Sequence, residues 1–136
     1  VNKVINELFG TIAGKRITIL GWSFKKDTND SRESAAIYIA DKLIEEGAVL
    51  SIYDPRVKEQ QIYRDLNALK TRYEEINNEA LSIYNRPNDA FVGSHAVIIV
   101  TEWDEFKTYN WSKIISRVKV LDGRSIIPHA NYTIGK

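Results

Sequence analysis

Apolar residues recur along the chain at two spacings, which predicts strands that alternate with helices. Short runs rich in β-branched residues and bounded by turn residues are typical of strands. They lie at Lys15–Leu20, Val49–Tyr53, Leu81–Tyr84, Ala96–Val100, Val118–Leu121 and Tyr132–Ile134. Apolar residues spaced three or four apart predict helices at Ser34–Glu46, Gln60–Leu69, Pro87–Val92, Glu102–Phe106 and Trp111–Ser116. This alternation favours an α/β fold with a doubly wound, mostly parallel sheet flanked by helices.

The first residues carry a further helical pattern. An apolar stripe with helical spacing begins at Val1 and runs to Ile12, with no capping residue before it. The chain also contains no methionine. We therefore expect residues 1–13 to be the end of a longer helix and the chain to be part of a longer protein.

Composition narrows the class of protein. The chain has 136 residues, of which 43% are hydrophobic and 27% charged, as in one soluble globular domain. A net charge of +1 argues against a nucleic-acid or membrane partner. No apolar run approaches the roughly 20 residues of a spanning helix. The chain has no cysteine, which excludes a cysteine nucleophile within it and agrees with a cytoplasmic location. His95 and His129 are isolated, so no metal site is expected.

The segment Gly21–Ser34, between the first strand and the first full helix, is the strongest candidate for ligand binding. Ligands of doubly wound sheets bind at the carboxyl ends of strands, where such loops lie. A dinucleotide loop is rich in glycine, but Gly21 is alone here, and we expect Trp22 and Phe24 to block a close backbone approach. The segment instead offers side-chain cations, which are Lys25, Lys26 and Arg32.

Two later segments follow strands and are expected at the same edge of the sheet. They are Thr101–Trp103 and Asp122–Arg124, so that Lys25 and Arg124 could converge on one anion. The alternative is a solvated loop surface. Cations near a helix start oppose the helix dipole, which favours binding over surface decoration.

Two other features have competing interpretations. Asp54 ends the second strand where dinucleotide folds place a ribose-binding acid, but Asp54-Pro55 is also a common turn, and we favour the turn. The aromatic residues from Trp103 to Trp111 could stack on bases or pack in a core or a subunit contact. Packing is favoured because no basic residues interleave with them.

The segment Gly21–Ser34 resembles the signature Gly-x-x-Phe-Lys-x-x-Thr-x-Asp-x-Arg-x-Ser of the UDP-glucose/GDP-mannose dehydrogenase family. Ile52–Pro55, Ala96–Trp103 and Asp122–Arg124 resemble later landmarks of that family, in order, so that the resemblance covers the whole chain. Within the family, the residues of these segments resemble most those of the animal members that act on UDP-glucose.

This resemblance implies a Rossmann-like, C-terminal UDP-sugar-binding domain at 14–136, joined by the helix of 1–13 to the rest of an enzyme. The family oxidises UDP-glucose to UDP-glucuronate with NAD, through a cysteine that would lie outside this chain, so that no catalytic residue is expected within it. Phe24 and Lys25 would touch the UDP-sugar, Arg124 its ribose and phosphate region, and Arg32 would reach toward NAD. A homo-oligomer is expected.

Three alternatives remain open from the sequence. The domain could belong to a sibling enzyme acting on UDP-N-acetylmannosamine or on GDP-mannose, or it could be a nucleotide-binding module without catalysis. Arg32 could serve only in a salt bridge with Asp30 or Glu33. The chain also departs from the animal pattern at Asn29 and Ser31, where Gly and Thr are usual, and its end is shorter than the family suggests.

Overall fold

The computed structural model describes residues 12–32, 34–68, 81–124, 126 and 132–133. The helix expected over 1–13 lies outside these residues, except for the last two, which are not helical. Among the described residues no helix is long and apolar enough to cross a membrane.

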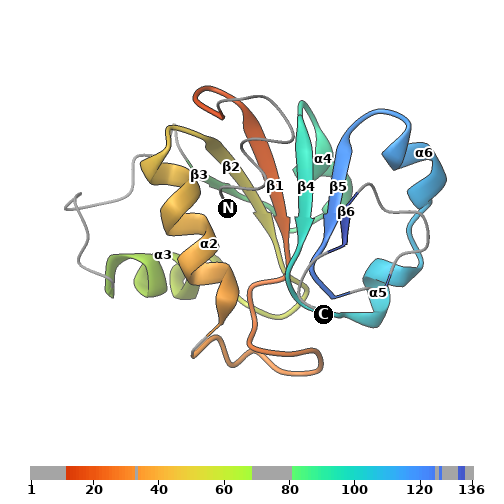
Figure 1. Ribbon diagram of the computed structural model, residues 1–136. Coiled ribbons are helices and arrows are strands. Elements are labelled where there is room, and N and C mark those ends of the chain that lie inside the picture. Colours follow the sequence, from red (N-terminus) through yellow and green to blue (C-terminus); the bar gives the residue numbers. More distant parts are fainter. Residues whose placement is uncertain (1–11, 33, 69–80, 125, 127–131, 134–136) are drawn as a thin grey trace.

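Six strands form one sheet in the order β3-β2-β1-β4-β5-β6, and every pair is parallel (Figure 1). The strands are β1 (Arg16–Leu20), β2 (Val49–Tyr53), β3 (Leu81–Ile83), β4 (Ala96–Ile99), β5 (Lys119–Asp122) and β6 (Tyr132–Thr133). The chain builds outward from β1 to β3, then crosses back to place β4 on the other side of β1. The predicted doubly wound sheet is therefore confirmed, with its switch point between β1 and β4.

The described helices lie between the strands, as the pattern predicts. They are α2 (Ala35–Glu45), α3 (Glu59–Ala68), α4 (Pro87–Phe91), α5 (Asp104–Lys107) and α6 (Trp111–Ile115). Ser34 caps α2 by accepting a hydrogen bond from the backbone N–H of Ala36 at 3.2 Å. Gly47 follows the helix with a φ of +91°, a conformation that glycine adopts without a Cβ penalty. Ser34 and Gly47 thus flank the helix that the apolar spacing predicts over Ser34–Glu46.

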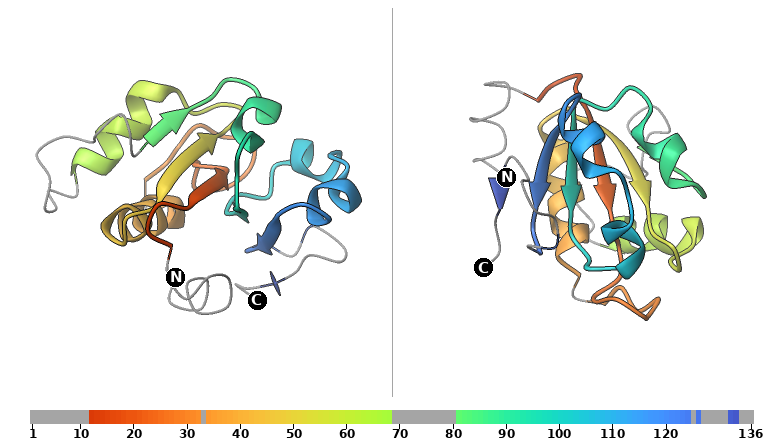
Figure 2. Two further views of the ribbon diagram at one scale, coloured as in Figure 1. Left: turned by 90° about the horizontal axis from the view of Figure 1, so that it is seen from above. Right: turned by 90° about the vertical axis from the view of Figure 1, so that its right-hand side faces the viewer.

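The period of two along each strand divides the apolar residues between two cores. Ile17 and Ile19 of β1 face the core that α2 and α3 complete, whereas Leu20 joins the core of α4, α5 and α6. Viewed from above, α2 and α4 lie on opposite faces of the sheet (Figure 2). The four residues of β4 are all buried, as expected of a central strand with both faces covered.

The aromatic residues after β4 pack within the second core. Trp103, Phe106 and Trp111 are each at most 6% exposed, and the ring centroids of Phe106 and Tyr109 lie 5.8 Å apart. Tyr109 and Tyr53 donate hydrogen bonds to the Glu105 carboxylate. Burial, and then this carboxylate, raises the pKa of both phenols. The favoured interpretation of these aromatics as packing residues is confirmed.

Gly21, at the start of the first loop, packs against Thr101 just after β4, and this contact generates a first prediction. Its φ is +98°, and an added Cβ would lie 2.5 Å from the Cβ and Oγ1 of Thr101. Gly14 has a similar φ of +77° but open space around it. Gly14→Ala should lower the free energy of unfolding by about 1–2 kcal/mol through backbone strain alone. Gly21→Ala should lower it by a further ~1–3 kcal/mol because of the clash.

Urea denaturation of both variants and the parent measures this difference. Equal losses for the two variants would contradict the close approach of this loop to β4.

Candidate functional site

The loops that follow β1, β4 and β5 meet at the carboxyl edge of the sheet, next to the switch point. The backbone N–H of Val100 donates to the carbonyl of Leu20 at 2.9 Å, and that of Gly123 donates to Ile99 at 3.0 Å. The hydroxyl of Thr101 also donates to the carbonyl of Ser23 at 2.9 Å. The three segments that the sequence placed at one edge are therefore tied to one another directly.

Asp54 holds the first of these loops in place. Its carboxylate is 7% exposed and accepts five N–H bonds of 2.6–3.1 Å. Oδ2 accepts from the backbone of Trp22 and Ser23 and from the indole of Trp103, and Oδ1 accepts from the backbone of Arg56 and Val57. Because both oxygens are committed, the possible role of Asp54 in ribose binding is wrong. The turn interpretation is right, but it misses the three bonds to distant segments.

Trp22 holds the loop from the core side and does not cover its solvent-facing side. Its side chain is fully buried in the core with α2 and α3, and its indole N–H donates to Asp65 of α3 at 2.9 Å. The hydroxyl of Ser31 donates to the same carboxylate oxygen at 2.5 Å. The expectation that the bulk of Trp22 blocks a ligand is therefore wrong. Phe24, in contrast, is 47% exposed.

Glu102 links the first loop to Arg124. The Oε1 atom of Glu102 accepts from the backbone N–H of Lys26 at 3.3 Å, and its Oε2 atom lies 3.7 Å from Nη1 of Arg124. The Nε–H of Arg124 donates to the carbonyl of Val100 at 2.8 Å, so that the guanidinium lies along the end of β4. No role for Glu102 is predicted from the sequence. The signal that could have found it is an acid within a few residues of the end of a buried strand.

The predicted cations differ in their surroundings. Lys25 is exposed, and its ammonium makes no hydrogen bond or ion pair within the part of the chain that the structure describes. Lys26 lies 3.4 Å from Asp104, an exposed ion pair of small energetic value. Lys25 and Arg124 thus belong to segments that meet at one edge of the sheet. Glu102 contacts both segments, at Lys26 in the first and at Arg124 in the second.

Arg32 lies apart from this group. Its side chain is 88% exposed and makes a two-pronged contact with Asp30, with Nε to Oδ1 at 3.0 Å and Nη2 to Oδ2 at 2.8 Å. Hydrogen bonds from Arg32 lower the pKa of Asp30 to about 2. The structure thus contains the salt bridge to Asp30, which was one of the alternatives for Arg32. The side chain of Arg32 still faces solvent.

A small apolar hollow adjoins Arg124. It has a volume of about 260 Å³ and lies between the start of α2 and the ends of β4 and β5. Its walls are Ala35, Ile39, Ile98, Ile99, Val100 and Gly123. An apolar wall beside one cation suits a ligand that carries both an uncharged ring and an anion.

The residues that the structure describes at this edge do not form a cradle for a dinucleotide cofactor. Gly21 is directed against Thr101, so that it offers no open backbone to a pyrophosphate. Asp54, at the position of a ribose-binding acid, has both oxygens occupied. Arg32, the residue predicted to contact the cofactor, is exposed. In the described ranges, no group of three or more histidines, aspartates or glutamates is arranged to hold a metal ion.

Comparison with known proteins gives one consistent family. Residues 18–129 match the sequence model of the UDP-glucose/GDP-mannose dehydrogenase family, UDP binding domain. The UDP-glucose 6-dehydrogenase of Drosophila melanogaster is 43% identical over 132 residues, which cover 93% of this chain and 28% of that protein. UDP-glucose 6-dehydrogenase 1 of Arabidopsis thaliana is 36% identical over 157 residues, covering 99% and 33%. The chain thus spans about a third or less of the length of these relatives.

A solved structure shares the fold. The UDP-glucose dehydrogenase of Pyrobaculum islandicum superposes with a TM-score of 0.73 at 24% identity, over 98% of this chain and 28% of that one.

The role of Asp54 leads to a second prediction. Asp54→Ala removes the acceptor from five buried or half-buried N–H groups, and should lower the free energy of unfolding by about 3–5 kcal/mol. Asp54→Asn keeps one oxygen and should fall between this variant and the parent. Asp104→Ala is the matched control, because its carboxylate is 69% exposed and its loss should leave stability nearly unchanged.

Thermal and urea unfolding measure these effects. An Asp54→Ala protein as stable as Asp104→Ala would refute the assigned role.

Proposed function

Because the chain belongs to the UDP-glucose/GDP-mannose dehydrogenase family, we propose that it is the UDP-sugar-binding domain of an enzyme that oxidises UDP-glucose to UDP-glucuronate with NAD. Residues 14–136 would form the domain, and residues 1–13 would end the helix that joins it to the rest of the enzyme. The observation that supports this proposal best is the joined edge of the loops after β1, β4 and β5, within the matched residues.

Phe24, Lys25 and Arg124 are the residues proposed to contact the UDP-sugar. Within the described residues the ammonium of Lys25 has no partner, so it can pair with a phosphate without breaking a bond seen there. Arg124 keeps N–H groups beyond those given to Val100 and Glu102, and its planar fork suits a ribose diol or a phosphate. The exposed ring of Phe24 can cover an apolar face of the ligand. Glu102 would orient the guanidinium of Arg124.

NAD would accept the hydride in this reaction, and its main contacts would come from residues outside this chain. Arg32 is proposed to reach toward it, since its guanidinium is exposed and pairs with Asp30. The chain itself would bind and orient the UDP-sugar.

Glucose is favoured over the sibling sugars because of the relatives. Both curated relatives described above are named UDP-glucose 6-dehydrogenase, at 43% and 36% identity. The module without catalysis remains the competing proposal, and an assay of an intact enzyme carrying this domain separates the two.

A third prediction concerns binding of UDP-glucose to the chain itself. One part of a pocket makes few contacts, so the dissociation constant should be on the order of millimolar. Amide shifts in an NMR titration should cluster at Gly21–Thr28 and Asp122–Arg124. Arg124→Lys keeps the charge but loses the fork, and should weaken binding by about tenfold or more. Arg64→Lys, on the exposed side of α3, is the matched control and should bind as the parent does.

Shifts confined to the aromatic residues 103–111 would contradict the proposed site. Equal binding by the Arg124→Lys and Arg64→Lys proteins would leave Arg124 as an ordinary surface charge.

A fourth prediction is that the chain alone forms no NADH from UDP-glucose and NAD. The reason is that it has no cysteine to carry the sugar during oxidation. Absorbance of NADH measures this, with the Drosophila melanogaster enzyme added to the same mixture as the positive control. NADH formation above the buffer rate by the purified chain would overturn the domain assignment.

A further inference from the structure

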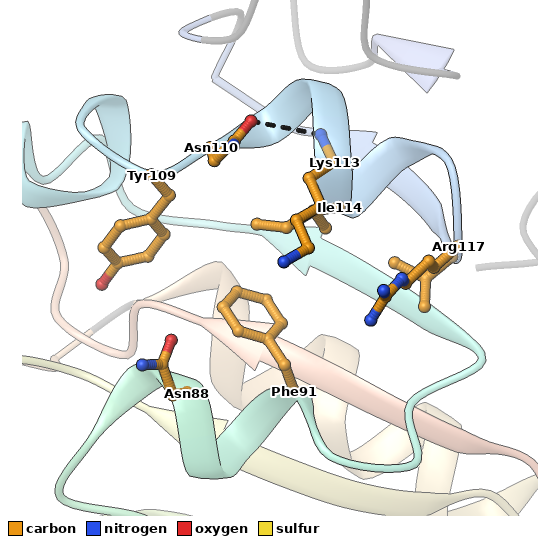
Figure 3. Close-up of a pocket in the computed structure, with 8 residues that line it drawn as sticks. Asn88, Phe91, Tyr109, Asn110, Lys113, Ile114 and Arg117 are labelled. Atoms are coloured by element: carbon orange, nitrogen blue, oxygen red, sulfur yellow. Dashed lines mark hydrogen bonds between the residues drawn. The ribbon is translucent and has the colours of Figure 1, made fainter.

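A second hollow lies far from the loops described above. It has a volume of about 430 Å³ and lies between α4 and α6 (Figure 3). These helices directly precede β4 and β5, so the hollow is near the amino ends of the strands, whereas the loop 21–34 is at the carboxyl ends (Figure 1). Its volume is in the range of small-molecule sites, which is about 300–1,000 Å³. The proposed UDP-sugar site makes no use of it.

Two cations line this hollow, and neither has a partner of opposite charge among the residues that the structure describes. Lys113 of α6 and Arg117, just beyond its end, are four residues apart and lie on the same side of the turn. Like charges at this spacing repel each other. Neither side chain makes an ion pair within the described ranges, although Lys26, Lys42 and Lys107 each do. The position is therefore an unneutralised cation pair that an anion would stabilise.

The rest of the wall is aromatic and amide in character. The ring of Phe91 meets Tyr109 edge to face, with centroids 6.1 Å apart and planes at 86°, and meets Trp111 at 6.3 Å and 89°. These contacts fix the ring where it points toward Lys113 and Ile114 in Figure 3. Asn88 adds an amide with both a donor and an acceptor. A ligand with a flat ring and an anionic group would meet both kinds of wall.

We propose that this hollow binds a mononucleotide, with its base against Phe91 and its phosphate between Lys113 and Arg117. A simple inorganic anion would leave the aromatic wall unused, and a flat uncharged ring would leave the cation pair unneutralised. A nucleic acid is a poorer fit, because the chain has a net charge of only +1. This proposal is independent of the UDP-sugar site and concerns the opposite end of the sheet.

The three tryptophans make the test specific, because each indole N–H has a different acceptor. Trp111 donates to the carbonyl of Phe106 at 2.6 Å, beside Phe91. Trp22 donates to Asp65 and Trp103 to Asp54, both at the carboxyl edge. In an NMR titration of the whole chain with AMP, the indole signal of Trp111 should shift and saturate, while those of Trp22 and Trp103 should stay in place.

Charge removal then tests the phosphate contact. The double variant Lys113→Gln/Arg117→Gln should raise the dissociation constant for AMP at least about tenfold. Lys42→Gln, on α2 and paired with Glu46 at 3.6 Å, removes a surface charge elsewhere and should bind AMP as the parent does. Adenosine and inorganic phosphate, each offering half of the ligand, should both bind at least about tenfold more weakly than AMP.

Several results would overturn the proposal. One is a Trp111 signal that does not move at saturating AMP, and another is a double variant that binds AMP as tightly as the parent. A third is a Trp111 shift that depends on protein concentration and not on AMP, which would make the hollow a contact between copies of the chain. Shifts of Trp22 and Trp103 alone would place AMP at the carboxyl edge and also overturn it. The UDP-glucose titration is judged on residues 21–28 and 122–124, so that either proposal can fail without the other.

Discussion

The buried carboxylate of Asp54 is the interaction on which the candidate site depends. Five N–H groups from three separate segments converge on its two oxygens. Buried N–H groups without an acceptor are costly, so the carboxylate stabilises these segments in this arrangement. Through Trp22 and Ser23 it fixes the start of the first loop, and through Trp103 it fixes the segment that carries Glu102.

This arrangement explains how the loop differs from a glycine-rich dinucleotide loop. Such a loop presents its own backbone to a pyrophosphate. Here the backbone N–H groups of residues 22 and 23 point inward to Asp54, and the indole of Trp22 is held by Asp65 of α3. The outer side is left to side chains, of which Lys25 and Phe24 are exposed. Recognition of a charged ligand then falls to side chains at the loop and to Arg124.

The cations at the two ends of the sheet differ in whether a described acidic or carbonyl group lies beside them. At the carboxyl edge, Arg124 is already oriented by Glu102 and by the carbonyl of Val100. At the amino end, Lys113 and Arg117 flank an aromatic wall without a described counter-charge. The same α/β architecture therefore supports two positions of distinct chemistry, one built from loops after strands and one from the helices that precede them.

The sequence by itself determined the alternation of elements, the parallel sheet and the ends of α2. These follow from local rules, since periods of 2 and 3.6, the Ser34 cap and Gly47 involve residues only a few positions apart. It also brought the loops after β1, β4 and β5 to one edge, because parallel strands share their direction. Only the tertiary structure decided what Asp54, Trp22 and Glu102 do. The bonds between Asp54 and Ser23, between Trp22 and Asp65 and between Glu102 and Lys26 join residues 31–76 positions apart, and no local pattern specifies which buried donor meets which acceptor.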